Sequence, residues 1–172
     1  MNDDSLKVGS NIIRFGKAWK ISRIVNKKSS EGSEEKTLFY QALFQKNDNN
    51  AIFSIPFENI DKTHIRYPIS KEKAKELLES LKQSPDENFN FDLLKSKEKL
   101  ALNDFDAWIE VLKQLWWTKN RQGKDFTSSK NEAFQLAKTK ICEEIACVFQ
   151  SSLTEAKALL QQSLIKTPAI EA

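Results

Sequence analysis

The sequence predicts an α+β fold made of a small antiparallel β-barrel followed by an all-helical domain. Residues 1–69 hold short apolar runs separated by polar, turn-forming segments, which is typical of strands. From residue 70 onward apolar residues recur every three to four positions, which is typical of amphipathic helices. With 172 residues and 40% hydrophobic content, the chain is long enough for two packed domains, which we place at 1–69 and 70–172.

The strands are predicted from apolar runs in the first third of the chain, at 12–15, 19–25, 38–44, 52–55 and 64–67. Two polar stretches lie between them, 26–36, which contains Gly32, and 46–50. Both are predicted as turns, so the pattern suggests hairpins that form a small antiparallel barrel.

The first helix is predicted to begin after Pro68 with Ser70 as its N-cap and to end near Pro85. The polar segment 84–90 is predicted to join the domains. A short second helix is predicted around 93–100, where three leucines recur, and Asn103 and Asp104 then interrupt it and offer a cap for a third helix.

The third helix carries a continuous apolar stripe formed by Phe105, Trp108, Ile109, Leu112, Leu115 and Trp116. Trp117 projects about 100° from Trp116, so we expect it at the edge of this stripe or exposed. The segment around Gly123 ends the helix. Ser129 with Glu132, and Ser152 with Glu155, have the spacing of capping boxes and predict the starts of two further helices.

The residue types that usually perform catalysis are scarce. The single histidine, His64, lies in a predicted strand, where we expect a structural role. Cys142 and Cys147 lie about 140° apart on a helix and do not form a metal-binding pair. The adjacent Glu143 and Glu144 are predicted to be solvated. Since phosphate-loop, dinucleotide and hydrolase motifs are also missing, we expect no enzyme activity, no cofactor and no metal.

The sequence has no apolar run of about 18 residues, and residues 1–10 lack the basic and apolar regions of a signal peptide. The two cysteines are too few for a disulfide framework, which fits a reducing compartment. We therefore expect a soluble cytoplasmic protein.

Two features suggest recognition of a partner. Residues 113–140 hold seven basic residues against two acidic ones, which favours either contact with phosphates or a solvated helix face. Beside Lys119 and Arg121, Trp117 could contact nucleic acid or protein, or lie half-buried under the following loop. Phe89 and Phe91 lie in the polar join, and one of them could belong to the core or act as an apolar wedge against a base step.

Several short motifs resemble, in order and spacing, those of the CarD/CdnL family, whose N-terminal module is shared with the transcription-repair coupling factor. Leu6-Lys7-Val8-Gly9 followed by Ile12-Ile13 resembles its opening strand. Ile52-Phe53-Ser54-Ile55-Pro56 followed by Asn59 and Ile65-Arg66 resembles its next conserved segment. In the helical half, the resemblance continues in Lys99-Leu100 with Asn103-Asp104, Leu115-Trp116, Ser129 to Glu132, and Ala137-Lys138 with Glu144-Ile145-Ala146.

The resemblance implies an SH3-like or Tudor-like barrel that docks on the β subunit of bacterial RNA polymerase, and a helical domain that contacts promoter DNA. It assigns polymerase binding to Phe39, Phe53, Ser54, Ile55, Pro56 and Arg66. It places Phe89 where the family has a tryptophan that wedges into the minor groove at the upstream edge of the transcription bubble. The DNA-contacting set expected on this reading is Phe89, Lys113, Trp117, Lys119, Arg121 and Lys124.

The resemblance therefore implies a monomeric transcription regulator that changes the stability of the open promoter complex without chemistry of its own. The sequence departs from the family pattern after the wedge position, where Phe91 and Asp92 replace basic residues, and at Ser54, which replaces an arginine. These departures keep open a second reading, a protein–protein adaptor with the same fold that has lost DNA binding. An enzyme is the third reading, which would require a cleft with convergent carboxylates.

Overall fold

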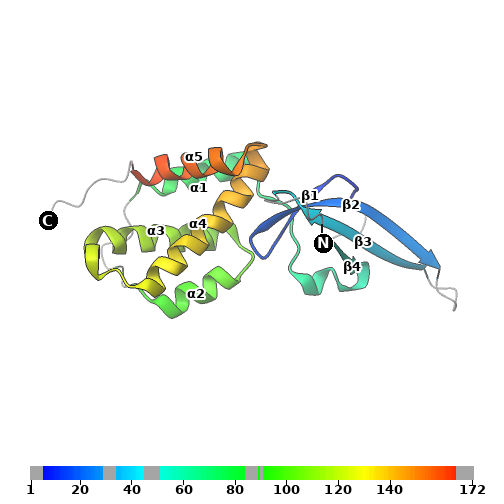
Figure 1. The fold of residues 1–172 in the computed structure, drawn as a ribbon, viewed down its shortest axis with the longest axis horizontal. Helices are drawn as coiled ribbons and strands as arrows, with labels where there is room; N and C mark the ends of the chain where they lie inside the picture. The colour runs from blue at the N-terminus through cyan, green and yellow to red at the C-terminus, as the bar shows by residue number, and fades with distance from the viewer. Residues whose placement is uncertain (1–5, 29–33, 45–50, 84–88, 90, 166–172) are drawn as a thin grey trace. The chain divides into compact units, whose positions relative to one another are not determined.

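A computed structural model describes residues 6–28, 34–44, 51–83, 89 and 91–165. The chain divides into two compact units, Met1–Pro68 and Ile69–Ala172, here called the β unit and the helical unit (Figure 1). Strands lie in the first unit and α-helices in the second, so the α+β class predicted from the sequence is confirmed.

The β unit is an open antiparallel sheet in the order β1-β2-β3-β4. Its strands are β1 (Asn11–Arg14), β2 (Lys17–Lys28), β3 (Glu34–Ala42) and β4 (Ile52–Pro56). The β1–β2 turn is a two-residue loop in which Phe15 and Gly16 both have positive φ, 51° and 74°. Paired positive φ angles match the right-handed twist of the flanking strands, which explains the tight reversal at this point.

One face of this sheet covers a hydrophobic core. Alternate residues of all four strands point into it, because strand side chains alternate between the two faces. The core consists of Leu6, Ile12, Ile21, Leu38, Tyr40, Ile55, Ile60 and Ile65. The other face, here called the outer face, points away from this cluster.

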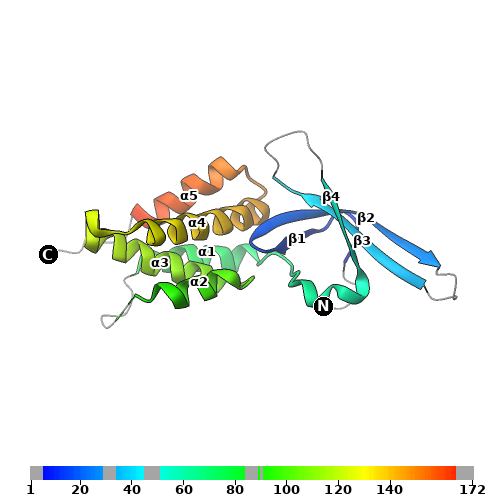
Figure 2. The same ribbon diagram turned by 60° about the horizontal axis from the view of Figure 1, so that its bottom comes forward.

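The long β2–β3 hairpin differs from the prediction. Pairing continues from Asn26–Lys36 to Lys28–Glu34, so most of the stretch predicted as a turn is strand (Figure 2). Polar side chains do not prevent strand formation here, because the ladder hydrogen bonds are made by backbone groups. Gly32 and the predicted turn at 46–50 lie outside the described residues.

The predicted fifth strand at 64–67 is reduced to one bridge. Backbone groups of Ile13 and Arg66 exchange two hydrogen bonds, with N···O distances of 2.8 and 3.1 Å. His64 has a left-handed backbone (φ 53°) at the end of a 3-10 turn, Asp61–Thr63, so the chain bends where a strand was expected. A second 3-10 turn, Phe57–Asn59, precedes it.

The helical unit contains five α-helices: α1 (Lys71–Ser80), α2 (Leu93–Ala101), α3 (Phe105–Gln122), α4 (Ser128–Phe149) and α5 (Leu153–Ile165). Their number and approximate positions agree with the sequence prediction. In α1, Ser70 accepts a hydrogen bond from the Lys73 N–H, which confirms the predicted cap. α1 contacts α3, α4 and α5, so the predicted domain join at 84–90 does not separate it from the other helices.

Caps decide where the later helices begin. Asp104 caps α3 through the N–H groups of Asp106 and Ala107, as predicted. Ser152 and Glu155 form the predicted capping box of α5, with reciprocal bonds of 2.8 and 3.2 Å to backbone N–H groups. The predicted cap of α4 is wrong: Thr127, not Ser129, accepts the hydrogen bond from the Lys130 N–H.

α4 is the central helix, because it packs against α1, α2, α3 and α5. Its burial extends beyond its apolar stripe to Glu144, which is fully buried and was predicted to be solvated. The Glu144 carboxylate accepts a hydrogen bond of 3.0 Å from the Ile69 N–H. Burial of this carboxylate is compatible with folding because backbone donors compensate part of its desolvation.

Candidate binding surfaces

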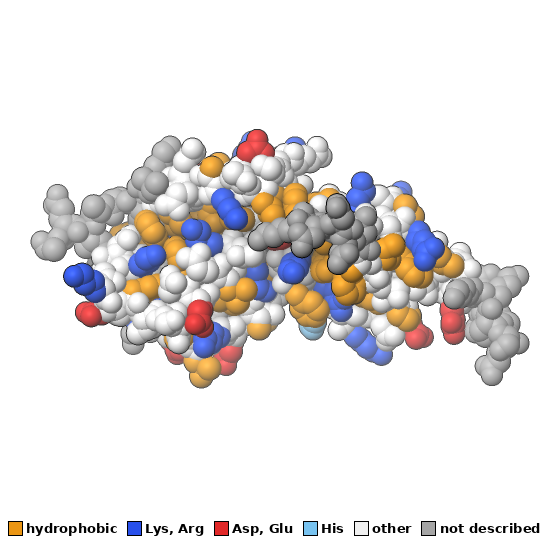
Figure 3. All heavy atoms as spheres, viewed as in Figure 1, with side chains coloured by type: hydrophobic (Ala, Val, Ile, Leu, Met, Phe, Trp, Pro, Cys, Tyr) orange, Lys and Arg blue, Asp and Glu red, His pale blue; other side chains and the backbone are white. Residues whose placement is uncertain are grey.

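The clearest exposed apolar feature of the β unit is β4. It is an end strand that pairs with β3 and with no other strand of the described residues. Ile52 is 54% exposed and Phe53 is 46% exposed. Figure 3 shows hydrophobic side chains on the surface of this unit with Lys and Arg side chains around them. An end strand with exposed apolar side chains offers a partner both backbone hydrogen-bonding groups and hydrophobic contact.

Strand register divides the predicted polymerase-binding residues between the two faces. Ser54 lies opposite Phe39, and both belong to the outer face together with the exposed Ile52. Ile55 lies opposite Leu38 and is buried in the core, so its predicted contact with a partner is wrong. Pro56 is exposed at the end of β4.

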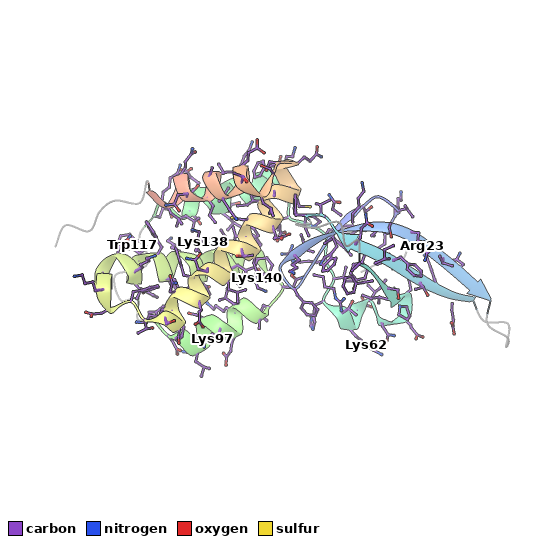
Figure 4. All side chains as sticks on the ribbon, in the orientation of Figure 1. Arg23, Lys62, Lys97, Trp117, Lys138 and Lys140 are labelled. Carbon is purple, nitrogen blue, oxygen red and sulfur yellow. The ribbon has the colours of Figure 1, made fainter. Side chains whose placement is uncertain are left out.

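The outer face also carries a cation that sequence reasoning missed. The Arg23 guanidinium lies 4.1 Å from the centroid of the half-buried Phe39 ring, and Figure 4 labels Arg23 in the sheet. The β2–β3 pairing places these two residues directly opposite each other. A cation stacked on a ring is held in place and remains able to meet an acidic group of a partner. Alternation within β2 would have indicated the face of Arg23, but only the register identifies its partner.

An aromatic cluster supports β4 from the other side of the sheet. The Phe53 ring contacts Trp19 edge-on at 5.3 Å and stacks on Tyr40 at 5.9 Å. Arg14 donates a hydrogen bond to the Tyr40 hydroxyl. Burial raises the pKa of Tyr40 and the nearby Arg14 opposes part of that rise, so the phenol stays protonated at neutral pH. These contacts fix the orientation of Phe53 while leaving almost half of it exposed.

Arg66 lies apart from the other predicted polymerase-binding residues. Its backbone pairs with Ile13 of β1, at the opposite end of the strand order from β4. Its guanidinium donates to the carbonyl of Tyr67 at 3.1 Å. The structure therefore groups Phe39, Phe53 and Ser54 around β3 and β4, and it does not place Arg66 with them.

In the helical unit, Trp117 is only 8% exposed, so the expectation that it lies at a stripe edge or exposed is wrong. Trp116, which was placed in the buried stripe, is half-buried and stacks on Phe134 at 6.2 Å. Trp117 follows the exposed Glu110 by seven residues, so it lies on the face of α3 that its own sequence marks as polar. Tertiary packing at the end of α3, labelled in Figure 4, covers that face.

The corner between α3 and α4, residues 119–130, gathers several predicted DNA-binding residues and is called the basic corner below. Arg121 and Lys124 are exposed there. Lys119 is partly buried, with its ammonium 5.9 Å from the Phe126 ring and 5.1 Å from the Phe134 ring. Lys113 lies further back on α3 and is partly buried. Of the predicted cations, Arg121 and Lys124 are therefore the most accessible.

Phe89 lies close to this corner. Its ring contacts that of Phe91 at 6.4 Å, and the Lys130 ammonium lies 5.6 Å from the Phe91 ring. Phe89 is partly buried, so both interpretations of the pair retain support: it packs against the unit and also presents an edge to solvent. Lys130 was not singled out by sequence, although it belongs to the basic stretch 113–140.

Within the described residues, no group of three or more His, Cys, Asp or Glu side chains is arranged to hold a metal ion. Over the same residues, every helix is too short or too polar to cross a membrane. No protein-family model matches this chain, and no curated protein matches it.

Proposed function

We propose that this chain is a CarD-like transcription regulator that binds the β subunit of bacterial RNA polymerase through β3 and β4. The observation that carries the proposal is the exposed end strand β4, which coincides with the segment that the resemblance assigns to polymerase docking. The proposal includes an SH3-like or Tudor-like identity for the sheet and action in the cytoplasm, where the polymerase works.

Docking would use strand addition. The free side of β4 supplies backbone groups, Ile52 and Phe53 supply apolar area, and Arg23 on the outer face supplies a fixed positive charge. Among the described residues of the β unit, ten are Lys or Arg and four are Asp or Glu. This surplus favours an acidic partner surface and would speed association at low salt.

The docking proposal is tested by the binding of the full chain to purified bacterial RNA polymerase core enzyme, measured by biolayer interferometry. Ile52→Asp changes an exposed side chain outside the core, and we expect it to weaken binding at least tenfold. Leu94→Asp on α2 is the matched control, because Leu94 is 69% exposed and belongs to the helical unit. Equal affinities of the two variants, or no binding of the native chain at low salt, would contradict docking through β4.

The second part of the proposal is DNA contact by the helical unit, through Phe89, Arg121 and Lys124. We expect Phe89→Ala to shorten the lifetime of the open promoter complex. Replacing Arg121 and Lys124 by Gln should lower the salt dependence of promoter-fork binding by about two phosphate contacts, with a slope change of roughly 0.9 for each. Lys95→Gln with Lys97→Gln on α2 is the control pair, since both are exposed on another helix.

An adaptor without DNA binding is the second candidate, and one observation favours it. Trp117 is buried and Lys119 is held between two rings, which removes two of the six predicted DNA contacts from direct access. This candidate predicts normal polymerase binding, no salt-dependent affinity for the promoter fork, and an open-complex lifetime that Phe89→Ala does not change.

A further inference from the structure

α4 and α5 are joined by a tight turn and enclose a polar groove. Gln150 ends α4 in a left-handed conformation (φ 54°), and the Ser151 N–H donates to the Ala146 carbonyl at 3.0 Å. The chain then reverses into α5, and Figure 2 shows the two helices as neighbours. A groove of about 410 Å³ lies between them, lined by Gln135, Lys138, Thr139, Cys142, Lys157, Ala158 and Gln161.

The spacing of the lining residues shows that two helix faces meet here. The four residues from α4 follow the i, i+3, i+4, i+7 rule and therefore share one face. The three from α5 lie within one turn of each other. Facing sides of packed helices normally bury apolar side chains, whereas five of these seven are amide, hydroxyl or ammonium groups. The small side chain of Ala158 leaves room between them.

The charge of the groove is positive. Lys138 and Lys157 line it, and no Asp or Glu does. The Lys138 ammonium lies 5.5 Å from the Phe134 ring, which restrains its position, and Figure 4 labels this residue on α4. Neither lysine forms an ion pair with the residues that the structure describes.

The thiol at the base of the groove does not neutralise these lysines. Burial raises the pKa of Cys142 to about 11, although Lys138 and Lys157 both act to lower it. The influence of both ammonium groups on one thiol indicates that they converge on the same point. The nearby Glu143 acts on the thiol in the opposite direction but does not line the groove. Cys142 is therefore an uncharged group between two cations at neutral pH.

Neutral hydrogen-bonding groups complete the site. The side-chain amides of Gln135 and Gln161 each carry two N–H donors. The Thr139 hydroxyl donates to the Gln135 carbonyl at 2.9 Å, so its lone pairs point to an additional donor role from a ligand or water. Two cations with several amide donors and no carboxylate are the groups that bind a doubly charged oxyanion.

We propose that the α4–α5 groove binds a small molecule that carries a phosphate group. The phosphate lies between Lys138 and Lys157, and the side-chain amides of Gln135 and Gln161 donate to its oxygens. Since 410 Å³ exceeds the space that one phosphate needs, the remainder of the groove holds an organic part of modest size. This site lies outside the proposed docking surface on β4 and the basic corner, so it is independent of both.

The test uses the full chain and two probes, pyrophosphate and AMP, in calorimetric and amide-NMR titrations at low salt. We expect saturable binding, with shifts concentrated in residues 135–142 and 157–161. Lys138→Gln with Lys157→Gln should weaken affinity at least tenfold while leaving the thermal midpoint unchanged, because glutamine keeps the helix propensity. Lys95→Gln with Lys97→Gln on α2 is the matched control and should bind as the native chain does.

Three results would overturn the proposal: no binding of either probe at millimolar concentration, equal loss in the control pair, or shifts outside the groove. A short DNA duplex is titrated in parallel as the other source of phosphate. If duplex DNA alone shifts the groove residues and neither small probe binds, the small-molecule assignment is wrong. Polymerase binding by the same variants reports separately on β4, so failure here and failure of docking are distinguishable.

Discussion

Replacing Trp117 tests whether packing or exposure describes this residue, the point at which the structure departs most from the sequence expectation. Removing a buried Trp side chain typically costs about 3–5 kcal/mol. Trp117 is 8% exposed, so we expect Trp117→Ala to lower the free energy of unfolding by this amount. Total stabilities of small domains are about 5–15 kcal/mol, so the loss should be large enough to shift the whole transition.

The indole nitrogen of Trp117 makes a second variant informative. Its Nε1 is buried and has no hydrogen-bond partner in the structure. An unsatisfied buried donor costs about 1–3 kcal/mol. Trp117→Phe removes that donor together with three ring atoms, whose burial contributes on the order of 2 kcal/mol at roughly 0.8 kcal/mol each. The two effects have opposite signs, so Trp117→Phe should change the stability by less than about 1 kcal/mol.

Urea unfolding of the full chain, followed by the helical circular dichroism signal, measures both variants. This signal reports mainly on the helical unit, because the β unit contributes no α-helix among the described residues. A loss below about 1 kcal/mol for Trp117→Ala would refute the burial of this side chain. Equal losses for the Ala and Phe variants would refute the reasoning about the unsatisfied indole N–H.

Three further predictions concern α4 and α5. Thr127→Ala should cost about 1 kcal/mol in urea unfolding whereas Ser129→Ala should cost at most a few tenths, and the reverse order would return the cap of α4 to Ser129. Because Cys142 is buried and its pKa is raised to about 11, it should resist a disulfide-exchange reagent at neutral pH until the chain unfolds; rapid reaction of the folded chain would show an accessible thiolate. Hydrogen bonds from the Ser152 N–H and hydroxyl lower the pKa of Glu155 below its ordinary 4.5, so its stabilisation is complete above that pH and is lost as the pH falls through the lowered value. Thermal midpoints measured across this range should fall less steeply in Glu155→Gln, and identical slopes would contradict the capping role of the carboxylate.

The sequence by itself determined the features that depend on neighbouring residues. The change from strand to helix periodicity near residue 70 predicted the two kinds of structure, and the division between units falls between Pro68 and Ile69. Ser70, Asp104 and the Ser152–Glu155 box act as predicted, because a cap bonds to N–H groups two or three residues along the chain. Gly123 ends α3 with a positive φ of 51°, a backbone state that glycine adopts easily.

Only the tertiary structure decided which faces are covered and which side chains meet. The polar side of α3 is buried at Trp117, and Glu144 is buried beneath the Ile69 N–H, because segments distant in sequence pack onto them. Periodicity describes a helix with one buried face, and it fails where a helix such as α4 is surrounded by four others. Likewise, β-strand register places Arg23 on Phe39 and faces Lys138 with Lys157 across a groove, contacts that arise from pairing and packing and have no signature in local sequence.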